Sequence, residues 1–469
     1  MNSLLTLASL IICALIVVAV PMLVTPYVGH YGTVSVFDTS KAVLLCAALA
    51  TLGGLFSYRQ GPHGSFLLRI FVAALLTRML LGTLIFVFRG QDFFGGDALT
   101  YDVFGYAQLR GWGGERYYQS LADSFVGKGE GSGWGMVYFV AAIYGLVGRN
   151  MLAVQFVNSV LGAVTGTIIF ACAQHVFNNA RVARFAAVAV AFYPSLVLWS
   201  AQGLKDGPIV FFLALSIFAT LKLGDGISAK HMVVLIFSLF ALLSLRFYVF
   251  YMICVAIGGA FVIGLRSLTA TSFIRQFVVI IMLGLGLTYL GITRYAAVQF
   301  ETFGNLQQLQ SSRLDAAKSA QSGFGKDVDV STTGGALSTI PSGLLYLLFA
   351  PFPWQVASLR QSITLPEMLV WWASFPMLIL GLWFSIKYRL RQISPILIFT
   401  VMLSLAYSVF QGNVGNAYRQ RAQLLVFYFI FVAVGYVLLL ERREEKIRRN
   451  LAEREAIATS VVHQTDHNL

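Results

Sequence analysis

The stretch from Met232 to Leu265 reads MVVLIFSLFALLSLRFYVFYMICVAIGGAFVIGL, about 34 residues with one charged side chain, Arg246. A helix needs about 20 consecutive apolar residues to cross a bilayer. A run of this length therefore predicts two membrane helices in succession, 231–245 and 247–265. Arg246 would lie at the turn between them.

The composition extends this prediction to the whole chain. Of the 469 residues, 58% are hydrophobic and 11% are charged, and the mean hydropathy is +0.76. An ordinary soluble domain carries about 25% charged residues. Apolar runs recur from Leu4 to Leu440 without a soluble block between them. We therefore expect one all-α, polytopic membrane domain over 1–440, with about ten to thirteen embedded helices, and a cytoplasmic tail over 441–469.

Twelve segments have the length and apolar character of spans. The first, Leu4 to Val24 at its core, lacks the basic start and cleavage site of a signal peptide, so we interpret it as a retained helix. Two shorter segments, Trp134 to Val147 and Ser342 to Phe352, are expected to be re-entrant or to lie at the membrane surface. The twelve spans are 3–26, 40–57, 67–88, 151–175, 184–200, 207–223, 231–245, 247–265, 277–292, 367–386, 393–410 and 421–440.

Orientation follows from the basic residues, which give a formal net charge of +13. They form short clusters between apolar runs, such as Lys387 to Arg391 and Arg442 to Arg449, as is typical of cytoplasmic loops. Basic clusters of this kind attract anionic lipid, and we expect no nucleic-acid partner. This orientation places two long loops, 89–133 and 293–366, on the outer face.

The sequence contains none of the common soluble catalytic motifs. We find no phosphate-binding loop, zinc-protease helix or nucleophile elbow. The four cysteines lie inside apolar segments without metal-ligand spacing, so no metal site is predicted: Cys13, Cys46, Cys172 and Cys254. The candidate functional residues are therefore carboxylates and cations on the outer face.

Two acids occupy the first outer loop. Asp97 follows two glycines and is well placed to cap a helix, and Leu99, Val103 and Tyr106 would make that helix amphipathic along the membrane surface. Asp97 and Asp102 would then lie where a lipid-borne substrate meets water. The plainer interpretation is that Asp97 is only a cap and Asp102 only a solvated acid.

Four cations complete the candidate set. Lys205 adjoins Asp206 in a short outer turn. The alternative to a functional role for Lys205 is an internal ion pair with Asp206. Arg246 interrupts an apolar run, and an ionisable residue there is a functional hypothesis by default. The alternative is a side chain that reaches the interface. Arg419 and Arg421 lie on the outer side against the usual bias of basic residues, as expected if they bind an anion.

Several of these residues belong to short motifs in a familiar order. After Asp97 come the stretch from Gly145 to Asn158, Tyr193-Pro-Ser195, Leu204-Lys-Asp206 and Leu243-Ser-Leu-Arg-Phe-Tyr248. Over about residues 90–265 this order resembles the GT-C superfamily of membrane glycosyltransferases, in the branch of protein O-mannosyltransferases and the lipid A aminoarabinose transferase. Two features depart from the pattern: Ala98 follows Asp97 where many relatives have a second acid, and two helices precede the first outer loop.

The resemblance implies transfer of a sugar from a polyprenyl-phosphate donor to a glycan, lipid or protein acceptor, in cell-envelope or exopolysaccharide biosynthesis. The site would face the periplasm or outside of a bacterial inner membrane. Asp97 would be the general base, with Asp102 as a secondary acid. The donor phosphate would be bound by Lys205, Arg246, Arg419 and Arg421. A divalent metal is compatible with this superfamily, but no cofactor is predicted.

Two other classes remain open. A polysaccharide polymerase or ligase also uses lipid-linked glycans and outer-loop arginines, and there Asp97 could be dispensable. A transporter or flippase of lipid-linked glycans is the second, although the sequence contains no internal repeat and no matched pair of broken helices. The sequence does not specify the sugar, the acceptor or the oligomeric state.

Overall fold

The computed structural model describes residues 36–88, 93, 96–126, 134–263, 305–319 and 322–466, with short gaps near 326 and 357. It also describes some of the residues between 278 and 289. Within these residues the fold is all-α, and the one β-bridge joins Gly323 to Asn413. The predicted fold class is thereby confirmed. The predicted span 3–26 lies outside the described residues, and 277–292 lies partly outside them.

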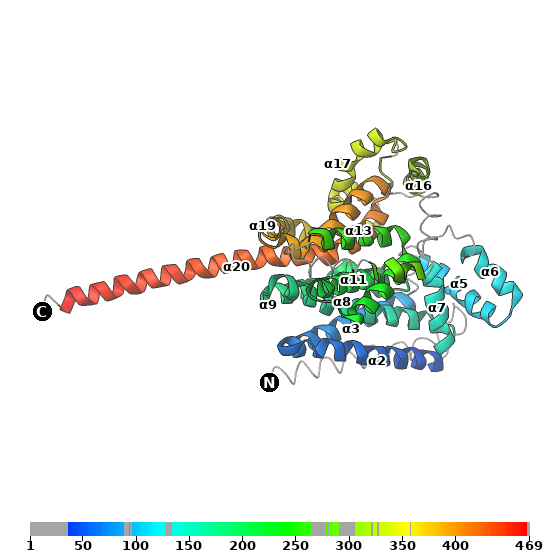
Figure 1. The fold of residues 1–469 in the computed structure, drawn as a ribbon, viewed down its shortest axis with the longest axis horizontal. Helices are drawn as coiled ribbons and strands as arrows, with labels where there is room; N and C mark the ends of the chain where they lie inside the picture. Colours follow the sequence, from blue (N-terminus) through cyan, green and yellow to red (C-terminus); the bar gives the residue numbers. More distant parts are fainter. Residues whose placement is uncertain are drawn as a thin grey trace.

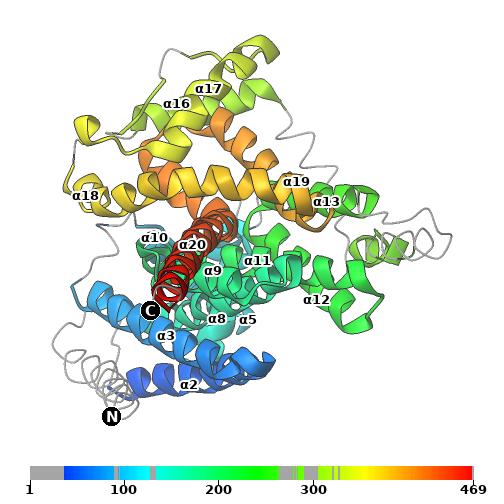
Figure 2. The same ribbon diagram turned by 90° about the vertical axis from the view of Figure 1, so that its left-hand side faces the viewer.

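The body of the molecule is a bundle of apolar helices of different lengths (Figure 1). They are α2 (Val36–Tyr58), α3 (Gly64–Val87), α8 (Met151–Phe177), α9 (Ala180–Phe192), α10 (Pro194–Ser200), α11 (Asp206–Asp225), α12 (Ala229–Leu245), α13 (Phe247–Ile263), α19 (Leu365–Phe410) and α20 (Val414–Asp466). Helix α8 is buried along most of its length and packs against α2, α3, α9 and α11. Figure 2 shows α20 nearly end on, between α19 and the α9–α11 side of the bundle.

Six helices of the described chain are long and apolar enough to span a membrane, or seven if α9 and α10 form one bent span. Four shorter apolar helices join them: α7 (Trp134–Val147), α12, α13 and α17 (Thr333–Phe349). The two helices expected on either side of Arg246 are present, each 17 residues long. At 14 residues, or about 21 Å, α7 is too short for a simple span, as the sequence predicted.

Four predicted spans differ from the observed elements. The segment 184–200 is two helices, α9 and α10, bent by 54° at Tyr193 and Pro194, because proline disrupts the helix that precedes it. The segments 367–386 and 393–410 are the two halves of α19, which loses helical geometry at Arg389. Helix α20 begins at Val414 rather than 421, and it continues past 440 without a break. Its residues 441–453, most of them charged, are exposed.

The two predicted outer loops contain short helices. The first holds α5 (Asp97–Trp112) and α6 (Arg116–Val126). The second holds α16 (Leu306–Ser319), α17, the 3-10 turn η2 (Pro353–Gln355) and α18 (Leu359–Ser362). In Figure 1, α5, α6 and α16 lie toward the end of the bundle opposite the C-terminus. The loop before α17 is joined to the start of α20, because Phe324 N–H donates to Gly412 O at 2.8 Å.

Candidate functional site

A cluster of charged side chains forms where several helices end. Asp97 and Asp206 are the first residues of α5 and α11, Arg246 lies between α12 and α13, and Arg419 is in the second turn of α20. Arg419 joins the two acids: its Nη1 lies 2.5 Å from Asp97 Oδ2, and its Nη2 lies 2.6 Å from Asp206 Oδ2. Arg246 Nη2 lies 3.6 Å from Asp206 Oδ1. We call Asp97, Lys205, Asp206, Arg246 and Arg419 the charge cluster.

Local geometry explains how α5 presents Asp97. Gly96 has a φ of 72°, in the left-handed region that glycine adopts without strain, and it occupies the N-cap position. Asp97 is therefore not the cap expected from the sequence, and its carboxylate bonds to Arg419 instead of to the first turn. An acid in the first turn is still favoured by the helix dipole, and the same applies to Asp206 in α11.

Arg246 is placed by a break in the backbone. Its φ of −160° and ψ of 89° end α12, and its own N–H donates to Leu242 O at 2.7 Å. The residue is only 5% exposed, so its side chain does not extend to water as the alternative interpretation required. Its guanidinium instead approaches Asp206 and lies 5.8 Å from the Tyr248 ring centroid.

The exposed fraction of the side chains increases from the inner to the outer side of the charge cluster. The Asp206 side chain is 1% exposed, whereas the Asp97 side chain is 47% exposed. Lys205, in the loop before α11, is also buried. Burial lowers the pKa of Lys205 to about 7, and the positive charge of Arg246 contributes in the same direction. With Lys205 protonated, three cations face two carboxylates, so the charge cluster has an excess positive charge that favours an anionic ligand.

Asp102 does not join the charge cluster. It lies one and a half turns along α5 from Asp97 and is buried, not solvated. Its Oδ2 lies 2.5 Å from Arg149 Nη2, and Tyr144 Oη donates to its Oδ1 at 2.5 Å. These contacts join α5 to α7 and to the loop before α8. The geometry supports a structural role for Asp102, although its proposed part in catalysis is a separate prediction.

Arg421 is also separate from the charge cluster. Successive helical residues turn by about 100°, so Arg421 projects from nearly the opposite side of α20 to Arg419. Its Nη1 lies 3.0 Å from Met368 Sδ, and its Nη2 donates to Ala350 O. The neighbouring Tyr418 Oη donates to the buried carboxylate of Glu367 at 2.6 Å. Arg421 thus holds the ends of α17 and α19 against α20.

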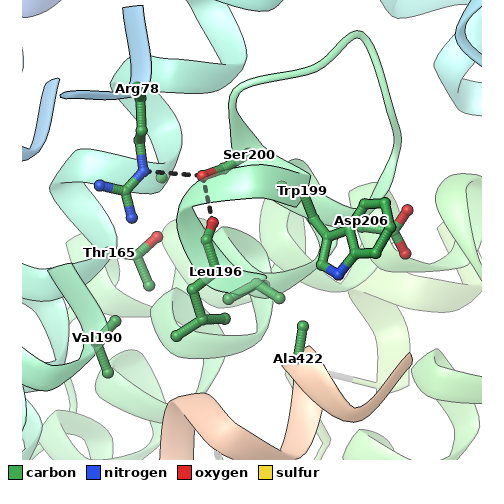
Figure 3. A pocket seen from close by; sticks show the side chains of 11 residues that line it. Arg78, Thr165, Val190, Leu196, Trp199, Ser200, Asp206 and Ala422 are labelled. Atoms are coloured by element: carbon green, nitrogen blue, oxygen red, sulfur yellow. Dashed lines mark hydrogen bonds between the residues drawn. The ribbon is translucent and has the colours of Figure 1, made fainter. Parts of the chain in front are cut away.

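Behind the charge cluster is a small cavity of about 20 Å³, room for about one water molecule, between Asp206 and Arg78 (Figure 3). Arg78 is 1% exposed and belongs to α3. Its Nε donates to Ser200 Oγ at 2.8 Å, and its Nη1 donates to Ala191 O at 2.7 Å. Sequence reasoning missed Arg78, although an arginine near the middle of the predicted span 67–88 is the signal that could have identified it.

Arg78 explains how the bend between α9 and α10 is held. Pro194 has no N–H to donate, so the helical hydrogen-bonding pattern is interrupted at the bend. The carbonyl oxygen of Ala191, near the end of α9, accepts from Arg78 Nη1. Ser200 ends α10, and the backbone carbonyls of Gln202 and Leu204 accept from Asn158 Nδ2 at 2.7 and 2.8 Å. These contacts fix the loop that leads to Lys205 and Asp206.

The fold and the charge cluster together define a multi-pass α-helical membrane protein. The cluster contains carboxylates and cations at helix ends, and no group of three or more metal-ligating side chains occurs in the described parts of the chain. No protein-family model matches the sequence, and no characterised protein matches it.

Proposed function

We propose that this protein is a glycosyltransferase that moves a sugar from a polyprenyl-phosphate donor to an acceptor at the outer membrane surface. The observation that carries the proposal is the charge cluster, in which Arg419 contacts both Asp97 and Asp206. It combines a half-exposed carboxylate with buried cations. The GT-C-like order of motifs favours the same reaction.

In the proposed reaction, the Asp97 carboxylate accepts the proton of an acceptor hydroxyl or amine as general base. The acceptor oxygen or nitrogen bonds to the anomeric carbon of the sugar, and the bond from that carbon to the donor phosphate oxygen breaks. The electron pair leaves with the polyprenyl phosphate. Arg246, Arg419 and protonated Lys205 stabilise the negative charge that develops on this phosphate.

The pairing of Arg419 supports a division of roles. Asp206 is fully buried and makes contacts with both Arg419 and Arg246, so it fixes the two guanidinium groups in position. The Asp97 side chain is exposed enough to contact an acceptor. Among the described ion pairs, the one with Arg419 joins Asp97 to the rest of the charge cluster. Binding of the donor phosphate by Arg419 would weaken its pairing with Asp97 and leave that carboxylate to the acceptor.

Asp97→Asn tests the assignment of the base. Removal of a general base typically lowers the rate by about 100- to 10,000-fold, whereas Asn retains the shape of the side chain. We expect the purified variant to fold normally and to lose transfer in an assay with a panel of polyprenyl-phosphate sugars. Asp123→Asn is the matched control, because Asp123 lies exposed on α6 in the same outer region. It should retain wild-type turnover.

The polymerase or ligase is the competing function. It would use the same cations, with a second lipid-linked glycan as acceptor. Near-normal turnover of Asp97→Asn would reject Asp97 as the base and favour this alternative. Loss of transfer in Asp97→Asn and retention in Asp123→Asn would support the proposed role.

A further inference from the structure

A second charged cavity lies at the opposite end of the bundle from the charge cluster. Helix α11 connects the two places, because Asp206 is the first and Asp225 the last of its 20 residues. At 1.5 Å per residue this helix is about 30 Å long, roughly the thickness of a bilayer core. The basic run from Lys387 to Arg391 also lies at this end. We refer to this space as the α19 cavity.

The α19 cavity has a volume of about 250 Å³ and lies between the ends of α8, α11 and α13 and the break in α19. One part of its wall is apolar. The remaining part carries charged and polar side chains. The apolar residues are Val176, Leu221, Ala260, Phe261 and Pro395, and the main polar ones are His175, Asp225, Arg389, Arg391, Gln392 and Ser394.

The break in α19 places the two arginines. Arg389 has a φ of −134° and a ψ of 17°, so the helix is interrupted there and a new helical segment begins with the residues that follow. Arg391 and Gln392, at the start of that segment, line the cavity. A straight helix would have carried Arg389 and Arg391 on opposite faces. The interruption instead brings both residues to the α19 cavity.

Positive charge predominates around the α19 cavity. His175 Nε2 lies 3.5 Å from Asp225 Oδ2, and Lys222 Nζ lies 3.4 Å from His175 Nδ1. Among the described side chains that line or adjoin the cavity, Arg389, Arg391 and Lys222 are cations and Asp225 supplies the carboxylate. Asp225 is 63% exposed, so solvent screens much of its charge.

We infer that the α19 cavity binds a phosphate group, with an anionic phospholipid as its source. Guanidinium groups recognise phosphate by paired hydrogen bonds, and the apolar wall at Phe261 provides a surface for an acyl chain. Basic pockets between membrane helices on the cytoplasmic side have this chemistry. This lipid site is independent of the transfer reaction proposed above. Its alternative is purely structural, with the arginines serving to stabilise the carbonyl ends of α8 and α11.

Lipid titration of the purified full-length protein tests the inference. Phosphatidylglycerol, with phosphatidylcholine as the neutral comparison, is added in detergent, and bound lipid is measured by native mass spectrometry. We expect selective binding of phosphatidylglycerol to the wild type. The double variant Arg389→Gln, Arg391→Gln should bind it about 10-fold or more weakly, because each charge-assisted hydrogen bond is a strong contact.

Two further variants separate ligand binding from helix stabilisation. Ala260→Leu fills the cavity without removing a charge, and leucine is favourable in a helix. It should fold normally and still lose phosphatidylglycerol. Lys387→Gln is the matched control, because Lys387 belongs to the same basic run but lies over the Trp383 ring, 5.0 Å from its centroid. It should bind phosphatidylglycerol as the wild type does.

The outcomes distinguish the ligand and its source. If inorganic phosphate in excess displaces phosphatidylglycerol, the site recognises free phosphate as well; if it does not, the lipid is required. Either result supports a phosphate site. Wild-type binding by both the double variant and Ala260→Leu would overturn the inference, as would equal weakening by Lys387→Gln. If the double variant does not fold, the result with Ala260→Leu decides.

Discussion

At the scale of single residues, the two arginines of Asn416-Ala-Tyr-Arg-Gln-Arg421 have different surroundings. Arg419 contacts two carboxylates of the charge cluster, whereas Arg421 contacts Met368 and the carbonyl of Ala350. We therefore predict that Arg419→Gln raises KM for the lipid donor while the protein remains folded. Arg421→Gln should instead lower thermal stability, by about 1–3 kcal/mol for a buried group left unpaired, and leave KM nearly unchanged. An equal effect of both on KM would contradict this division.

Lys205 makes the proposed reaction depend on pH. Burial lowers its pKa to about 7, so the ammonium is charged below that pH and loses its proton above it. The charge that attracts the donor phosphate is then lost as the pH rises. We predict that kcat/KM, which reports the free enzyme, falls above about pH 7. Lys205→Arg should flatten this fall, because a guanidinium stays protonated. An identical pH profile for the wild type and this variant would exclude Lys205 as the titrating group.

At the scale of elements, the bend between α9 and α10 depends on one buried side chain from α3. Arg78 bonds to Ala191 O before the bend and to Ser200 Oγ at the end of α10. Arg78→Gln should destabilise the protein by about 1–3 kcal/mol, because a buried carbonyl loses its donor. Thermal unfolding in detergent measures this change. Arg69→Gln, at an exposed position of the same helix, should have little effect on thermal stability. An equal loss of stability in the two variants would show that the buried contacts of Arg78 do not stabilise the bend.

At the scale of the whole molecule, helices α5, α6 and α16 of the two predicted outer loops lie toward the end of the bundle opposite the C-terminal part of α20 (Figure 1). We predict that this end faces outward, because the basic runs lie at the other end. Two exposed residues of these loops, Ser124 of α6 and Gln307 of α16, are suitable sites for labelling.

Cysteines introduced at Ser124 and Gln307, in a background without native cysteines, should react with an impermeant reagent in intact cells. A cysteine at Glu445, exposed on the tail of α20, should react only after the cells are opened. Labelling of Glu445→Cys in intact cells, or protection of either outer position, would contradict the predicted orientation.

The apolar runs in the sequence are sufficient to predict the membrane class and most of the helices. A long apolar run such as Met232 to Leu265 can form only a few structures. It must be buried in lipid or in protein, and its backbone N–H and C=O groups must hydrogen-bond to one another. The sequence also identified Asp97, Arg246 and Arg419 as exceptional charges. It did not specify the partner of each charge, because ion pairs such as Arg419 with Asp97 join residues far apart in the chain.

Which charged side chains contact one another depends on how the helices pack. Asp102 and Arg421 were grouped with the others by their positions along the chain, but the periodicity of α5 and α20 directs them to other neighbours. Asp206, regarded in the sequence only as the companion of Lys205, is the carboxylate that joins Arg246 to Arg419. The direction of a side chain depends on the rotation of its helix and on how that helix packs. These are set by the contacts of the whole bundle and not by the local sequence.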